Sequence, residues 1–284
     1  MISIAVLLLS VDFAVNRIYQ QKNSTSFKAG MQFNFFLGLF TAIIFFIFCG
    51  GTLKFSVFSL IMSIAITVFG IGYNVIGFKI LKNSGMSLYT MFLMNGGMIV
   101  PYIYGVLFLN EVFSVIRTIG LVFIITAVII ANSEKETKNR KNIILCIIVF
   151  FLNGFVSVIS KLHQIEHTYE IVSATEFVLY TGLVKCLMCG IILLFIPNTE
   201  GKRTDIESFG FLPLIALSAV IGGVSYLLQL FGAVDLPATV LYPFITGGSI
   251  VLSTIVGKIA FKENLSFKKV FGVIMCFIGT CMFL

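Results

Sequence analysis

Apolar residues fill the chain in ten long stretches that are separated by short polar segments. The roughly 30 Å hydrocarbon core of a bilayer is crossed by about 20 apolar residues in a helix, which is close to the length of most of these stretches. We therefore predict an all-α integral membrane protein with ten transmembrane helices, of which the fifth and tenth are short. The predicted ranges are 2–20, 29–49, 57–80, 87–109, 116–132, 143–163, 173–196, 209–232, 239–261 and 267–284.

The second half of the chain repeats the first. At a constant offset of 152 residues the matched pairs are Glu111 and Glu263, Ser114 and Ser266, Gly120 and Gly272, Gly70 and Gly222, Gly96 and Gly248, and Gly105 and Gly257. At an offset of 144 the pairs are Arg17 and Lys161, Gln20 and Gln164, Phe33 and Phe177, and Gly38 and Gly182. The sequence thus predicts two five-helix repeats, 1–132 and 143–284, joined by a basic loop at 133–142.

The basic residues indicate how the two repeats are oriented. A unit of five helices ends on the opposite side of the membrane from its start, so the second repeat enters from the other side. The loops after the odd-numbered predicted helices hold fourteen Lys and Arg, whereas those after the even-numbered ones hold only Lys54 and Arg117. Equivalent loops have exchanged their charge, as inverted repeats require. Because basic loops face the cytoplasm, this distribution predicts that both termini lie outside.

Composition agrees with lipid as the solvent. With 58% hydrophobic and 11% charged residues, a chain of 284 residues has too few polar side chains to cover a water-soluble globule. The net charge of +7 comes mainly from the basic loops, so it indicates a membrane-facing surface and no nucleic-acid partner. The six cysteines lie within or beside apolar stretches and predict no disulfide framework.

The sequence does not predict an enzyme or a cofactor. It contains no phosphate-binding glycine loop, no serine nucleophile elbow and no haem motif. His163 and His167, with Glu166 between them, could hold zinc only if the helix continued past Gln164 and a third ligand approached. We expect no metal.

Polar side chains inside the predicted helices are the candidates for a binding site. A charge that faces lipid costs at least about 2.5 kcal/mol, so such a residue normally faces a cavity or a partner. Asp12, which shares a helix face with Asn16, could bind a cation, an amine or a coupling proton. Lys185 lies in mid-helix and needs either an anionic substrate or a carboxylate partner, and both alternatives stay open. The acids available to it within the predicted helices are Asp12 and Glu176, but Glu176 lies near a helix end, where we expect an interfacial role. The candidates for substrate binding or coupling are Asp12, Asn16, Tyr73, Asn74, Asn95, Asn153, Ser157, Lys161, Lys185, Tyr226, Gln229 and Tyr242.

Small residues form a stripe on two equivalent predicted helices, where they allow backbones to approach closely. Pro101 also removes one helical hydrogen bond and could kink its helix. The stripes serve either gating or simple packing, whereas Glu111 and Glu263 are expected to be structural. The stripe residues are Gly97, Pro101, Gly105, Ser249, Ser253 and Gly257.

One segment carries a recognisable family pattern. It consists of Asn83-Ser84-Gly85, then Gly96, Gly97 and Pro101, then Leu109-Asn110-Glu111-Val112-Phe113-Ser114 and Gly120, and it recurs over 225–284. The pattern resembles the drug/metabolite transporter superfamily, EamA type. The resemblance implies ten helices in two inverted five-helix repeats, a central cavity, and transport of a small polar or amphipathic solute. It also implies cytoplasmic termini, in disagreement with the basic loops.

These patterns together predict a secondary transporter that works by alternating access, either uncoupled or driven by an ion gradient. The expected substrates are amino acids, amines or drug-like compounds. Sugar uptake is the alternative within transport, and a lipid-handling or regulatory membrane protein without a transport cavity is the alternative from another class. Expected partners are the small-molecule substrate and membrane lipid, with a proton or other coupling ion and a homodimer as open options. We expect the protein to be integral to a plasma membrane, that of a bacterium.

Overall fold

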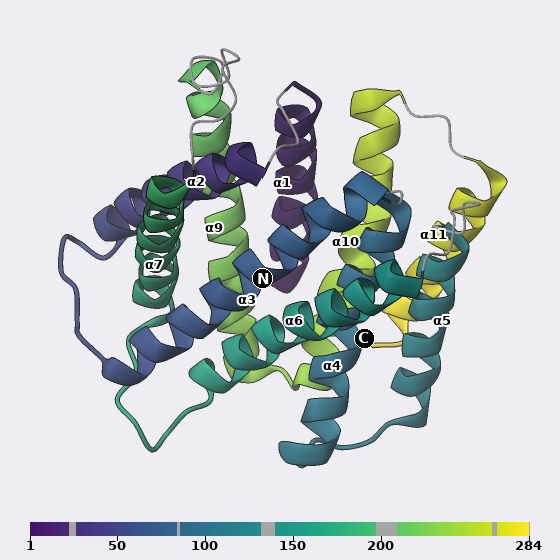
Figure 1. Ribbon diagram of the computed structural model, residues 1–284. Coiled ribbons are helices and arrows are strands. Elements are labelled where there is room, and N and C mark those ends of the chain that lie inside the picture. Colours follow the sequence, from purple (N-terminus) through teal and green to yellow (C-terminus); the bar gives the residue numbers. More distant parts are fainter. Residues whose placement is uncertain (23–26, 84–85, 132–139, 197–208, 263–265, 284) are drawn as a thin grey trace.

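The computed structural model describes residues 1–22, 27–83, 86–131, 140–196, 209–262 and 266–283 (Figure 1). Regular structure within these ranges is entirely helical. It comprises ten α-helices and one short 3-10 helix: α1 (Ile2–Lys22), α2 (Phe27–Phe48), α3 (Val57–Asn83), α4 (Met86–Phe108), α5 (Val115–Ala131), α6 (Arg140–Gln164), α7 (Ala174–Phe195), η1 (Phe209–Phe211), α9 (Leu212–Asp235), α10 (Ala238–Phe261) and α11 (Phe267–Cys281).

Each α-helix corresponds to one of the ten apolar stretches predicted from the sequence. Six contain a segment long and apolar enough to cross a membrane, namely in α2, α3, α6, α7, α9 and α10, and α1, α4 and α5 contain shorter apolar segments. Large apolar side chains such as Leu194 and Phe195, which are 83% and 81% exposed, cover much of the outer surface. The molecule is therefore an integral, multi-pass membrane protein.

Helices from the two halves of the chain pack against one another. The N-terminal helix α1 lies against α9 and α10 of the second half, while α6 lies against α3 and α4 of the first. Among the other contacts between halves, α2 pairs with α7 and α5 with α11, on opposite sides of the molecule in Figure 1, and α4 lies against α10. Neither half could therefore be removed without exposing helix faces that are buried in the whole protein.

Two glycines bring the backbones of α2 and α7 together. A Cβ atom at Gly38 would lie 2.7 Å from the amide nitrogen of Cys186 and 2.8 Å from the carbonyl oxygen of Gly182. A Cβ atom at Gly182 would lie 2.9 Å from the amide nitrogen of Ala42. Because these neighbours are backbone atoms, they cannot turn aside as a flexible side chain would. Close approach of this kind is typical of helix pairs in membranes.

Apolar side chains form two main cores on either side of the molecule. Phe45 and Phe177, which are fully buried, lie in the core shared by α2, α7 and α9. Met98 and Ile124, also fully buried, lie in the core shared by α4, α5 and α11. The helices between these cores, α1, α6 and α10, carry most of the buried polar side chains described below.

Hydrogen bonds attach the loop before α3 to the start of α7. Glu176 accepts from the backbone N–H of Lys54 at 3.0 Å, and the hydroxyl of Tyr180 donates to the carbonyl oxygen of Lys54 at 2.8 Å. Glu176 also completes a capping box with Ser173 at the N-terminus of α7. The interfacial role expected for this carboxylate is thus to satisfy backbone groups at a helix end.

We expect Gly38→Ala to destabilise the protein, because its methyl group would force apart two backbones that now touch. Overpacking of this kind costs about 1–3 kcal/mol of unfolding free energy, which thermal unfolding of the detergent-solubilised protein would report as a lower Tm. Gly70→Ala is the matched control, since the nearest atom to its new methyl group is a Tyr73 ring carbon at 4.0 Å. Equal Tm values for the two variants would contradict the close crossing.

Candidate functional site

The carboxylate of Asp12 lies between α1 and α9 and receives hydrogen bonds from both. Ser218 Oγ donates to Asp12 Oδ1 at 2.5 Å, and Asn16 Nδ2 donates to Oδ2 at 3.0 Å. Asn16 reaches the carboxylate because residues four apart are neighbours on a helix surface. Gly222 leaves the space that the carboxylate fills, since a Cβ atom there would lie 3.1 Å from Asp12 Oδ2. The acid is therefore held in a polar site inside an otherwise apolar bundle.

Ser218 and Gly222 are residues of this site that sequence reasoning did not select. A serine in an apolar helix commonly bonds to a carbonyl of its own preceding turn, so Ser218 carried no signal of its own. Gly222 was recognised only as the repeat counterpart of Gly70. Assigning both residues to Asp12 requires the rotation of α9 relative to α1, which the sequence does not specify.

Lys185 is close to this site but does not pair with it directly. Its half-buried ammonium makes no hydrogen bond, and no ion pair within 4.0 Å, with any residue the structure describes. It nevertheless interacts electrostatically with Asp12 over a longer distance. Of the two alternatives considered for Lys185, a direct ion pair with Asp12 is therefore not the one that the structure contains.

Tyrosine hydroxyls from α9 and α10 meet the polar face of α6. Tyr226 bonds to Ser160 Oγ at 2.8 Å, and the Tyr242 hydroxyl donates to the carbonyl oxygen of Ser157 at 2.6 Å. Both tyrosines have intramolecular partners here, so their hydroxyls act as joints between helices. Gln229 likewise donates to Ser225 within α9, at 3.2 Å.

The same face of α6 bonds to the backbone of α4. Asn153 Nδ2 donates to the carbonyl oxygen of Leu93 at 2.7 Å, and Ser157 Oγ donates to that of Gly97 at 3.3 Å. Gly97 permits this approach, since a Cβ atom there would lie 2.6 Å from Asn153 Nδ2. Asn95, also on α4, differs from these residues because its buried Oδ1 has no hydrogen-bond partner among the described residues.

The remaining candidates take part in packing. Tyr73 lies against the small cluster formed by Cys146 and Val149, and Asn74 beside it is half-buried. Pro101 is buried inside α4, which continues through it. Ser249 and Ser253 donate to carbonyl oxygens of their own helix, and Gly257 is buried.

Two charged side chains hold the turn between α9 and α10. Lys161 Nζ donates to the carbonyl oxygens of Ala233 at 2.5 Å and Leu236 at 2.7 Å, at the C-terminus of α9. Glu111 accepts from the backbone N–H groups of Ala238 at 2.6 Å and Thr239 at 2.8 Å, at the N-terminus of α10. Each charge thus meets the helix end of opposite partial charge and bonds to groups that lack a partner within the helix.

These contacts give Lys161 a different role from the one considered on sequence alone, and they agree with the structural role expected for Glu111. Lys161, a candidate for substrate binding or coupling, is buried and directed at backbone carbonyls. Glu111 caps a helix of the other half, which extends the structural role expected for it, and Gly105 gives its carboxylate room. Its repeat counterpart Glu263 lies outside the described residues.

His163 does not form a metal site with its neighbours. The ring is stacked on Phe177 with centroids 3.6 Å apart, and its two nitrogens bond to Ser59 and Gln164, each at 2.8 Å. The helix ends at Gln164. In the following loop the backbone N–H of Thr168 bonds to the Glu166 carboxylate and, with two neighbouring N–H groups, lowers the pKa of that acid. The part of the chain that the structure describes holds no group of three or more His, Cys, Asp or Glu suited to a metal.

Comparison with known proteins gives one family and one fold. The sequence model of a family described as the EamA-like transporter family matches residues 140–284. A solved structure described only as the crystal structure of a protein superposes with a TM-score of 0.73, covering 99% of this chain and 94% of that chain. Their sequences are 15% identical, so this likeness concerns the fold alone. No curated protein matches the chain.

We expect Glu111→Gln to lower the unfolding free energy by about 1–2 kcal/mol, the range for losing a helix cap. A glutamine offers one acceptor where the carboxylate offers two, and its amide NH2 would face a backbone N–H. Thermal unfolding in detergent would show this as a reduced Tm. Glu170→Gln removes the same charge from an exposed side chain that makes no hydrogen bond to the described residues. Our assignment fails if both variants melt alike.

Proposed function

Because the chain belongs to the EamA-like transporter family, whose members move small molecules across membranes, we propose that it is a secondary transporter working by alternating access. Its substrate is a small polar or amphipathic metabolite that binds between the two halves. The site of action is the plasma membrane, that of a bacterium. We propose transport without enzymatic turnover.

The observation that carries this proposal is the pair of opposite charges formed by Asp12 and Lys185. The Asp12 carboxylate is ordered by Ser218 and Asn16, whereas the Lys185 ammonium nearby has no bonded partner among the described residues. An unpaired charge in a low-dielectric interior costs several kcal/mol. A substrate that supplies an anion to Lys185 removes that cost, and a substrate ammonium can be stabilised by Asp12.

This arrangement favours substrates that carry charge. A zwitterion such as an amino acid offers one group to each side chain, and a simple amine offers one group to Asp12. A sugar would leave both charges uncompensated, so sugar uptake is the weaker alternative within transport. A lipid-handling or regulatory protein does not require an acid and a base within two apolar helices, so their cost would bring it no binding function.

The packing of helices from each half against the other half supports alternating access. If the chain is two inverted five-helix repeats, 1–132 and 143–284, then α1 corresponds to α6, and α9 and α10 correspond to α3 and α4. The packing of α1 on α9 and α10 then repeats the packing of α6 on α3 and α4. In inverted repeats these two similar sets of contacts have opposite orientations in the membrane, which is what a carrier needs to open on either side.

The Asp12→Asn variant tests the cation site. We expect uptake of amines and amino acids into proteoliposomes to fall at least tenfold, because a charge-assisted hydrogen bond contributes about 1.5–3 kcal/mol. If Asp12 also binds a coupling proton, any pH dependence of wild-type flux should disappear with it. Thr126→Ala is the control, since that hydroxyl donates to the Val122 carbonyl oxygen of its own helix and belongs to none of the candidate sites. Undiminished uptake by Asp12→Asn across a panel of amino acids, amines and sugars would refute the site.

The Lys185→Met variant tests the anion site. It keeps a long, unbranched side chain but removes the charge, so transport of solutes with a carboxylate should fall at least tenfold while transport of simple amines is retained. A Tm measured in parallel separates this role from a structural one. Removing an unpaired buried charge should not lower the Tm, whereas removing one member of an ion pair would. A clear loss of stability would mean that Lys185 has a structural partner.

A further inference from the structure

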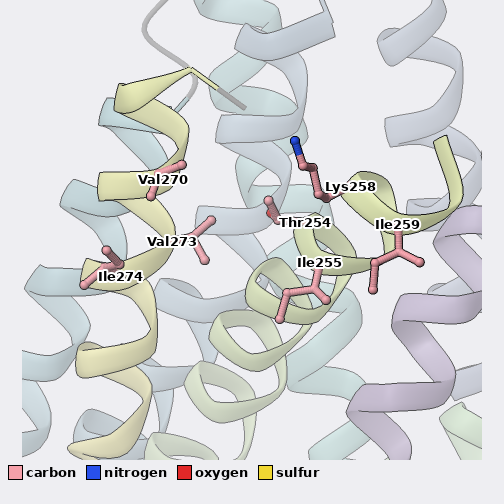
Figure 2. A pocket seen from close by; sticks show the side chains of 7 residues that line it. All are labelled: Thr254, Ile255, Lys258, Ile259, Val270, Val273 and Ile274. Carbon is pink, nitrogen blue, oxygen red and sulfur yellow. The ribbon is translucent and has the colours of Figure 1, made fainter. Parts of the chain in front are cut away.

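A narrow groove runs between the last turns of α10 and the first turns of α11, far from the Asp12 site in the sequence and on a different helix pair. Its volume is about 200 Å³. Figure 2 shows Lys258 at one end of it, with the amino group directed away from the isoleucine side chains. The groove is lined by Ile255 and Ile259 of α10 and by Val270, Val273 and Ile274 of α11.

The size and lining of this groove indicate a hydrocarbon chain as its occupant. Pockets for drug-sized solutes enclose about 300–1,000 Å³ and contain several converging polar groups. Here the volume is smaller, and apart from Thr254 and Lys258 the lining side chains are branched aliphatic ones. Many of them, including Ile255, Ile259 and Ile274, are exposed on the membrane-facing surface. An acyl chain can enter from the side without leaving the bilayer.

Positive charge gathers at one end of the groove. Lys258, Lys262 and Lys268 are exposed and Lys269 is half-buried. Between residues 254 and 281 the sequence opposes these four lysines with a single acid, Glu263. Lys268 and Lys269 also stand in the first turn of α11, where the helix dipole is positive and favours an anion. The segment therefore holds an excess of positive charge that an anionic group would offset.

The polar and apolar parts of the groove are arranged as in a phospholipid. Lys258 and Val270 lie where α10 ends and α11 begins, whereas Ile255 and Ile274 lie one turn further along each helix. We take the helix ends as the level of the membrane surface, because the apolar stretches of both helices end there. We propose that an anionic phospholipid binds here, with its phosphate against Lys258 and the neighbouring lysines and one acyl chain along the groove. This site is independent of the transport proposal, which stands or falls on Asp12 and Lys185.

Native mass spectrometry of the detergent-solubilised protein tests this inference. With equal amounts of phosphatidylglycerol and phosphatidylcholine, we expect the wild type to retain phosphatidylglycerol preferentially. Lys258→Gln should weaken that retention about fivefold, since one interfacial lysine contributes about 1 kcal/mol to binding an anionic lipid. Lys54→Gln removes one exposed lysine from the loop before α3 and should leave retention unchanged.

A second variant separates the groove from the charges. Val273→Phe fills the groove and keeps every lysine, so it should also reduce phosphatidylglycerol retention, and its Tm checks that the fold is intact. Equal retention of the two lipids by the wild type, or equal effects of Lys258→Gln and Lys54→Gln, would overturn the proposal. So would a dimer mass that Val273→Phe abolishes, because the occupant would then be a second copy of the chain.

Discussion

Inside a bilayer no water is available to bond to a backbone group or a charge, so each must find its partner in the protein. The turn between α9 and α10 shows how this requirement organises the structure. Its carbonyl oxygens are satisfied by Lys161 of α6 and its N–H groups by Glu111, which follows α4. Two charges that would be unfavourable in lipid thereby satisfy helix ends that would also be unfavourable there. The turn in this way ties together helices from both halves.

The same requirement separates side chains that are satisfied from those that are not. Four polar side chains form hydrogen bonds between helices and so stabilise the bundle, namely those of Tyr226, Tyr242, Asn153 and Ser157. The Lys185 ammonium and the side-chain amide oxygen of Asn95 (Oδ1) lack such partners among the described residues. In a membrane interior, unsatisfied groups are better candidates for a ligand than satisfied ones, because binding a ligand relieves an existing cost.

Hydrophobicity predicted each of the ten α-helices found in the described residues, because long apolar stretches favour helices of about the length that a bilayer requires, whatever the helix later packs against. The candidate site was harder to predict from the sequence. The sequence identified Asp12, Asn16 and Lys185 as polar residues in apolar helices, but Ser218 reaches Asp12 only through the rotation of α9, and Lys161 reaches its carbonyls across 72 and 75 residues of chain. Such contacts depend on which faces of two helices pack together, and the hydropathy of the sequence does not specify those faces.

The crossing of α2 and α7 has a mechanical consequence. Where Gly38 and Gly182 meet, the backbones of the two helices touch directly. The crossing lies near the middle of both helices, so the two ends of one helix move in opposite directions when it turns on the other. Each helix has 22 residues and is about 33 Å long, so a tilt of roughly 10° about mid-length would displace its ends by about 3 Å. A small rotation at the crossing therefore becomes a movement about as long as a hydrogen bond at the helix ends.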